Sequence, residues 1–170
     1  PPCNPTRGKQ LGRGCGPALR LGLIFRLSAA GGRWHHRRMT RYAIDAAVAL
    51  RLVRIGSDAD KRHQLVGPAV LRSHALSMLY RETRAGLIDE KTGRQQLEGL
   101  AGLKIRLLGD RVSRATAWKI AAQLHWDDTT MAEYLAVGVL QADALVTDAP
   151  RLRARADDLL PLADFSYLDA

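Results

Sequence analysis

The stretch TTMAEYLAVGVLQADALVTDAPRL, residues 129–152, constrains the fold more than any other part of the chain. Apolar residues recur at helical spacing between positions 131 and 140, and after a short turn the run ALV follows at 144–146. All three residues of that run are apolar, so both faces of the strand are apolar, which is typical of a strand inside a parallel sheet covered by helices on both sides. Such sheets bind ligands at the carboxyl ends of their strands, here at Thr147 and Asp148.

Strands and helices alternate through the rest of residues 39–170. The stretch LVGP at 65–68 is predicted as the entrance to a helix, with its proline at a tolerated early position. The pattern predicts an α/β fold, a three-layer α/β/α sandwich with a central, mostly parallel sheet. The predicted strands are 40–45, 104–108, 144–146 and 161–167, and the predicted helices are 46–55, 69–85, 111–124 and those beginning at 89, 129 and 150.

Charge is distributed unevenly along the chain, although the formal net charge is +9. Eight of the 26 basic residues and none of the 17 acidic residues lie in 1–38, which leaves 18 basic against 17 acidic residues in 39–170. The high net charge therefore describes the N-terminal part and not a binding face of the folded part. We expect residues 1–38 to be a basic, disordered extension and residues 39–170 to be the domain.

Both cysteines, Cys3 and Cys15, lie in that extension. With His35 and His36 they form no CxxC or HxxxH spacing, so a zinc site is not predicted. A domain without cysteine fits a reducing, cytoplasmic location. The apolar run 19–30 is short and interrupted by arginines, so neither a membrane span nor a membrane partner is expected.

The residues able to carry chemistry are acids at the ends of predicted elements. Neither GxGxxG, GxxxxGK, GxSxG nor HExxH occurs in the sequence. Asp45 follows the first strand, Asp128 precedes a helix and Asp148 follows a strand. Acids that converge at strand ends suit Mg²⁺, which takes oxygen ligands and activates water against a phosphodiester. Each acid also has a structural alternative, because Asp128 and Asp148 precede predicted helix starts and can act as caps.

The order of motifs resembles a PIN domain, specifically the VapC toxins of bacterial toxin–antitoxin modules. The resemblance covers about 130 residues and is carried by RYAIDAAVALRLV (41–53), LVGPAVLRSHALSMLYRETRAG (65–86) and AEYLAVGVLQADALVTDAPRL (132–152). It implies an acidic pocket holding Mg²⁺ or Mn²⁺ and endoribonuclease activity on RNA. It also implies neutralisation by a cognate antitoxin and assembly as a homodimer.

Only one of the four family acids is in register with this sequence. The first falls on Asp45, but the acid of the long middle helix falls on His74. The third and fourth positions hold Met131 and Ala149. Two other acids lie close to these positions: Asp148 lies one residue before the fourth, and Asp128 lies three before the third. Asp45, Asp128 and Asp148 are therefore the predicted catalytic residues and metal ligands.

His74 has three possible roles, and the departures from the family pattern leave several hypotheses open. His74 is an accessory metal ligand, a proton carrier, or a hydrogen-bonded helix residue without a catalytic role. The first hypothesis for the chain is a metal-dependent VapC-like endoribonuclease. The alternative is a degenerate PIN domain with little or no nuclease activity that binds an antitoxin or oligomerises. A third possibility is an unrelated small α/β ligand-binding module.

Overall fold

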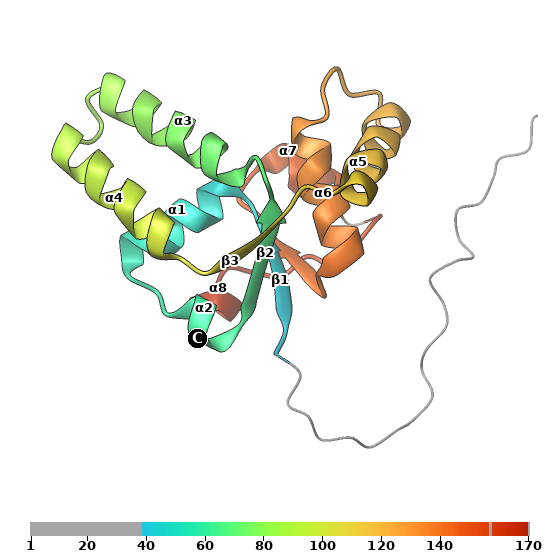
Figure 1. Cartoon of the computed structure of the whole chain (residues 1–170), viewed down its shortest axis with the longest axis horizontal. Coiled ribbons are helices and arrows are strands. Elements are labelled where there is room, and N and C mark those ends of the chain that lie inside the picture. The colour runs from blue at the N-terminus through green and yellow to red at the C-terminus, as the bar shows by residue number, and fades with distance from the viewer. Residues whose placement is uncertain (1–38, 157, 170) are drawn as a thin grey trace, which may run out of the picture. The chain divides into compact units, whose positions relative to one another are not determined.

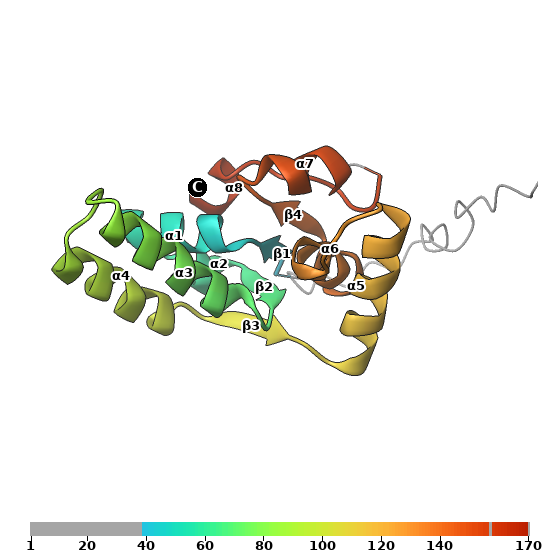
Figure 2. The same cartoon turned by 90° about the horizontal axis from the view of Figure 1, so that it is seen from above.

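A computed structural model of the chain describes residues 39–156 and 158–169 (Figure 1). The N-terminal extension predicted at residues 1–38, with its two cysteines, lies outside the described residues. The predicted α/β/α sandwich is confirmed: four parallel strands form a central sheet with helices on both faces (Figures 1 and 2). None of the helices in the described part is long and apolar enough to cross a bilayer.

The sheet has the strand order β3-β2-β1-β4, and all of its strands are parallel. The chain runs from β1 outward to β2 and β3, and then returns to add β4 on the other side of β1. The carboxyl ends of β1 and β4 therefore form the topological switch point, where open α/β sheets place their ligands. The strands are β1 (Arg41–Ile44), β2 (Gln64–Pro68), β3 (Ile105–Leu108) and β4 (Ala144–Val146).

The helices form two groups on opposite sides of the sheet (Figure 1). Helices α1, α3 and α4 pack against one another on one side, and α5 and α6 pack together on the other. The short helices α2, α7 and α8 complete the fold. The bounds are α1 (Ala46–Ile55), α2 (Ala59–Arg62), α3 (Leu71–Arg84), α4 (Glu90–Gly102), α5 (Arg111–Gln123), α6 (Thr130–Gln141), α7 (Pro150–Ala156) and α8 (Ser166–Asp169).

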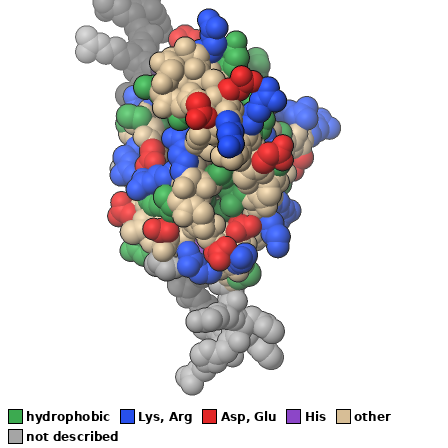
Figure 3. Space-filling model, turned by 90° about the vertical axis from the view of Figure 1, so that its left-hand side faces the viewer, with side chains coloured by type: hydrophobic (Ala, Val, Ile, Leu, Met, Phe, Trp, Pro, Cys, Tyr) green, Lys and Arg blue, Asp and Glu red, His purple; other side chains and the backbone are tan. Residues whose placement is uncertain are grey.

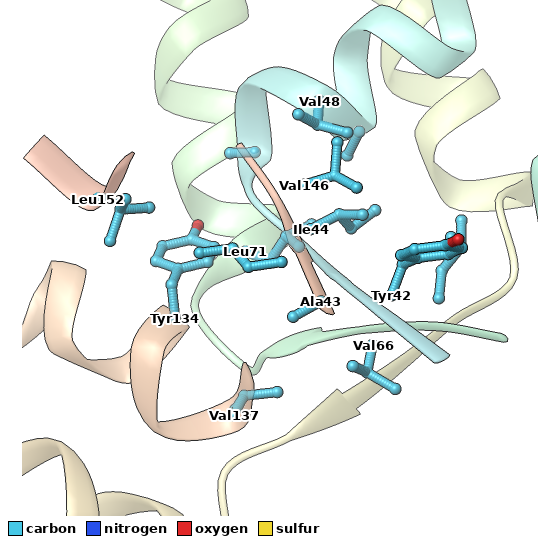
Figure 4. Close-up of a cluster of buried hydrophobic side chains, with 14 of the residues drawn as sticks. Tyr42, Ala43, Ile44, Val48, Val66, Leu71, Tyr134, Val137, Val146 and Leu152 are labelled. Carbon is cyan, nitrogen blue, oxygen red and sulfur yellow. The ribbon is translucent and has the colours of Figure 1, made fainter. Parts of the chain in front are cut away.

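The hydrophobic core lies on both faces of β1 and β4, as their sequences predict. Ile44 and Leu145 are fully buried, and α6 contributes Tyr134 and Leu135 to the same core. Figure 4 shows side chains from both strands converging with those of α1, α3, α6 and α7. Burying these groups supplies most of the driving force for folding, at about 25 cal/mol per Å² of apolar surface.

The predicted helix entrance at residues 65–68 is wrong, because these residues belong to strand β2. Leu65 and Val66 are buried and pair with β1 on one side and β3 on the other. A four-residue apolar run is too short for its periodicity to distinguish a strand from a buried helix start. Gly67 fits this point of the strand, since a Cβ there would lie 2.5 Å from Cδ1 of Leu71 at the start of α3.

The predicted strand at residues 161–167 is also wrong, apart from one residue. Leu162 makes an isolated parallel bridge to Leu145, supported by a bond from Leu145 N–H to the Pro161 carbonyl oxygen at 2.8 Å. The chain then turns into α8, where Leu168 is fully buried. Burial of Leu168 holds this segment as a short helix against the domain and stops the strand from continuing.

Aspartates cap two of the surface helices and give the fold an acid-sensitive component. The Asp89 carboxylate accepts a bond from Thr92 N–H at 2.6 Å, and that of Asp110 accepts from Ser113 N–H at 2.7 Å. These backbone hydrogen bonds hold the pKa of both carboxyl groups below the ordinary value of 3.8. The caps therefore stabilise the fold above pH 3.8, and this contribution is lost as the pH falls through the lowered values.

The variant Asp89→Asn/Asp110→Asn is expected to lose less stability on acidification than the wild type. Asparagine caps a helix about as well as aspartate but does not titrate. Urea unfolding at about pH 6 and about pH 3 measures the change for both proteins. An equal loss of unfolding free energy in the two proteins would show that the caps do not carry this pH dependence.

Candidate functional site at the carboxyl ends of β1 and β4

Asp45 lies directly after β1 and is almost fully buried, with an exposed fraction of 4%. Ile44 pairs with Val146 in the sheet, so the next residues, Asp45 and Thr147, leave their strands side by side. The Thr147 hydroxyl donates a hydrogen bond to Oδ2 of Asp45. The other carboxylate oxygen, Oδ1, accepts a bond from Val48 N–H at 2.8 Å and so caps α1.

This bonding satisfies the buried charge of Asp45 with groups of the protein itself. A buried carboxylate is costly unless it is hydrogen-bonded, and Asp45 receives one bond on each oxygen. It also lies at the amino terminus of α1, where the helix dipole favours a negative charge. The carboxylate therefore joins β1, α1 and the end of β4.

Thr147 extends the same network to α7. Its side chain is fully buried, and its hydroxyl oxygen accepts a bond from Ala149 N–H at 3.1 Å while it donates to Asp45. The Arg153 guanidinium donates to the Thr147 carbonyl oxygen at 3.1 Å. Thr147 thus fixes the turn that leads from β4 into α7.

The side chain of Asp148 points to the solvent-exposed surface, whereas that of its neighbour Thr147 points to Asp45. Side chains of successive residues in an extended segment point to opposite sides, and Thr147 takes the side that faces Asp45. The Asp148 carboxylate forms an ion pair with Arg51 of α1, at 3.4 Å, on a solvent-exposed surface. The same guanidinium lies over the ring of Phe165, with its central carbon 3.8 Å from the ring centroid.

Asp128 lies one residue before Thr129, the N-cap of α6, and bonds to the first residue of that helix. Its exposed carboxylate accepts a bond from Thr130 N–H at 2.8 Å. Hydrogen bonds from Thr130 hold the pKa of this carboxyl group below its usual value, and the nearby charges of Arg151 and His74 lower it further. Asp128 therefore bonds to the start of the helix, while its predicted role as a metal ligand stays a prediction.

His74 and Tyr134 form a pair beside this network. Nδ1 of His74 lies 3.0 Å from the Tyr134 hydroxyl oxygen, and the two rings stack with their centroids 5.8 Å apart. Tyr134 is buried, with its ring beside Leu71 and Leu152 (Figure 4). Burial raises the pKa of its hydroxyl, and the negative charges of Asp45 and Glu133 raise it further. The phenol is therefore neutral at physiological pH.

The side chains at this end of the sheet do not form a donor set that fits Mg²⁺ or Mn²⁺. In residues 39–156 and 158–169, no three His, Cys, Asp or Glu side chains gather as metal ligands. The third and fourth family positions, Met131 and Ala149, are apolar and pack against the core. The structure brings Asp45 close to Thr147 and Tyr134, and it places Asp128 and Asp148 in separate interactions.

Sequence reasoning identified the location of this network but missed Tyr134. Tyr134 lies on the buried face of α6, and its position within the apolar helix indicated only a core residue. One signal was available: Met131 and Tyr134 are three residues apart, so they share a helix face that points toward the strand ends.

Comparisons with known proteins support the fold. No family model matches the chain, and no curated protein matches it. The crystal structure of PAE2754 from Pyrobaculum aerophilum is similar, with a TM-score of 0.59 and 21% sequence identity. The match covers 76% of this chain and 94% of PAE2754. At this identity the likeness concerns the fold alone.

Proposed function

We propose that residues 39–170 form a degenerate, VapC-like PIN domain that acts by binding a protein partner. The observation that carries this proposal is the bonding of the three candidate carboxylates. Asp45 is bonded by Val48 and Thr147, Asp128 is bonded by Thr130 at the start of α6, and Asp148 pairs with Arg51. Charge count sets the affinity of oxygen-ligand sites for divalent cations, and here the carboxylates serve the fold separately.

Endoribonuclease activity with Mg²⁺ or Mn²⁺ stays a prediction from the resemblance to VapC toxins. The donor set at the strand ends argues against it, because Asp128 and Asp148 are engaged elsewhere and no group of three ligating side chains gathers around Asp45 in the described residues. One nitrogen of the His74 imidazole, Nδ1, is engaged with the Tyr134 hydroxyl. We therefore place the function of this domain in binding rather than in phosphodiester hydrolysis.

A groove between α3 and α4 is the surface that supports a protein partner. It has a volume of about 410 Å³ and is lined mainly by apolar groups. Leu76 and Tyr80 also line a second hollow of about 400 Å³, so they form a ridge between the two. Both are exposed, by 50% and 65%. Figure 3 shows apolar side chains between charged ones on the side of the molecule that carries α3 and α4.

The charges around this groove indicate what kind of partner fits. Glu90 pairs with Arg94 at 2.5 Å. Arg81 and Arg84, by contrast, have no carboxylate of the described residues within ion-pair distance. The groove therefore suits a segment of another protein with apolar side chains flanked by carboxylates. By resemblance this partner is the antitoxin of a toxin–antitoxin module in the cytoplasm.

With Mg²⁺ or Mn²⁺ present, the purified chain is expected to release no more RNA fragments than it does in EDTA. The reason is that the strand-end side chains do not provide a shared set of carboxylates. Incubation of the purified protein with labelled RNA and gel analysis of the products measures this. Cleavage that needs the divalent ion and disappears in Asp45→Asn would contradict the proposal.

Tyr80→Glu is expected to weaken binding of the cognate antitoxin by at least about tenfold. The substitution places a negative charge at an apolar contact and repels an acidic partner, and a central aromatic contact is typically worth 2 kcal/mol or more. Titration calorimetry with purified antitoxin measures the affinity. Val112→Glu is the matched control, since Val112 is an exposed apolar residue on α5, away from the groove.

Two results would contradict the assignment of the groove. One is equal antitoxin affinity for Tyr80→Glu and the wild type. The other is a wild-type dimer that Tyr80→Glu converts to a monomer in size-exclusion chromatography with light scattering, which would assign the groove to a second copy of the chain.

A further inference from the structure

A hollow lies at the amino-terminal edge of the sheet, where β2 and β3 begin. Its volume is about 480 Å³, which is within the range of small-molecule sites. Asp45 and Thr147 follow the carboxyl ends of β1 and β4, so they lie at the opposite edge of the same parallel sheet. The hollow is called the amino-edge pocket below and is lined by residues 39, 60, 63–65 and 104–106.

Two cations lie together at the β3 side of the amino-edge pocket. Lys104 immediately precedes β3 and Arg106 is the second residue of the strand, so their side chains point to the same side. Both residues are exposed, and neither has a carboxylate within ion-pair distance among residues 39–156 and 158–169. Their N–H groups can therefore bind the oxygens of an anion in the pocket.

Asp60 limits the negative charge that the pocket can accept. Oδ2 of Asp60 accepts a hydrogen bond from Lys104 N–H at 3.2 Å, which holds the carboxylate beside the start of β3. With His63 counted as neutral, two cations and one carboxylate leave the lining with a single net positive charge. A monoanion matches this charge, whereas a phosphate dianion carries one negative charge more and is repelled by Asp60.

The rest of the pocket wall is apolar, apart from one unused nitrogen. Leu65 is buried, Ile105 is half-buried and Met39 is 49% exposed. The His63 ring packs edge-on against Tyr42, with the ring centroids 5.1 Å apart. Nδ1 of His63 is buried and has no hydrogen-bond partner among the described residues. An unmade hydrogen bond on a buried nitrogen is costly, and a ligand oxygen can supply the partner once the ring turns toward it.

We infer that the amino-edge pocket binds a small monocarboxylate with an apolar body. The carboxylate lies between Lys104 and Arg106, and the apolar body covers Leu65 and Ile105. The pocket shares no lining residue with the groove between α3 and α4. The inference therefore does not depend on the proposed function.

The ligand used to test the pocket is 1-naphthoate, which joins one carboxylate to a rigid apolar ring system. The full-length protein is expected to bind it with a dissociation constant on the order of 0.1–1 mM, as is typical of a ligand with about a dozen heavy atoms. Isothermal titration calorimetry measures the affinity. The uncharged 1-naphthamide should bind about tenfold more weakly, because it lacks the charge-assisted hydrogen bonds to the two cations.

Two substitutions in the pocket should change the affinity for 1-naphthoate in opposite directions. Arg106→Gln is expected to weaken binding about tenfold, since it removes one of the two cations and keeps a polar side chain. Asp60→Asn is expected to tighten binding about threefold, because it removes a nearby negative charge while the amide oxygen still accepts from Lys104 N–H. A purely structural role of Asp60 does not predict a gain in affinity.

Arg84→Gln is the matched control. Arg84 is an exposed arginine of the groove between α3 and α4, and it also has no carboxylate of the described residues within ion-pair distance. This variant should bind 1-naphthoate as tightly as the wild type, and circular dichroism checks that every variant is folded.

Four results would overturn the inference. The first is no saturable binding of 1-naphthoate by the wild type up to about 10 mM. The second is equal affinity of Arg106→Gln and the wild type, and the third is equal affinity of the wild type for 1-naphthamide and 1-naphthoate. The fourth is tighter binding of 1-naphthyl phosphate than of 1-naphthoate, which would assign the pocket to phosphate groups.

Discussion

Asp45→Ala is expected to lower the free energy of unfolding by about 2–4 kcal/mol. The substitution removes the cap of α1, which typically costs 0.5–2 kcal/mol, and leaves the buried Thr147 hydroxyl without its acceptor. Both Val48 N–H and Thr147 lie in the interior, where water does not replace the lost bonds. Urea unfolding at neutral pH measures the change.

Asp45→Asn is the control that separates a structural carboxylate from a catalytic one. Asparagine retains an oxygen that caps α1, and its volume matches that of aspartate, so most of the stability should remain although its amide nitrogen does not accept the bond from the Thr147 hydroxyl. A stability loss as large as that of Asp45→Ala would mean that the negative charge or the Thr147 bond, and not the cap of α1, holds this part of the fold.

Tyr134→Ala is expected to have the largest effect of any substitution near the strand ends, about 3–5 kcal/mol of unfolding free energy. The ring is 2% exposed and fills the space between the strand ends and helices α3 and α7. Its removal leaves a cavity that the surrounding side chains only partly fill. Thermal and urea unfolding measure the loss.

Tyr134→Phe should cost only about 1 kcal/mol, because it removes the hydrogen bond to His74 and keeps the ring. It should also change the response to alkaline pH. The raised pKa of the Tyr134 hydroxyl means that its protonated form contributes stability, and this contribution is lost as the pH rises above the ordinary value near 10. A wild-type protein and a Tyr134→Phe variant with the same alkaline unfolding profile would contradict this account.

The strands that flank the site could be predicted from sequence because each is a short apolar run followed by a polar residue. The residues Tyr42 to Ile44 and Ala144 to Val146 are all apolar, so burial is the favoured environment for them. The turn residues around them set the strand ends. Strand β2 was missed because its four apolar residues run directly into the start of α3, so that local pattern alone does not separate the two elements.

The position of Asp45 could also be predicted, but its role could not. An acid after a buried strand is equally suited to capping the next helix and to binding a cation. The hydrogen bond from Thr147 could not be predicted, because Thr147 is distant in sequence and reaches Asp45 through the β1–β4 pairing. The direction of Asp148 likewise depends on Arg51 across the surface, a contact that spacing along the chain does not reveal.

The most direct test of the central claim is a titration of the full-length protein with Mn²⁺, monitored by electron paramagnetic resonance of the free ion. If Asp45 shares no cation with Asp128 or Asp148, which are engaged elsewhere, wild type and Asp45→Asn should take up the same amount of Mn²⁺ at every concentration. A saturable site with one Mn²⁺ per chain in the wild type, absent from Asp45→Asn, would contradict the account and restore the metal-dependent nuclease.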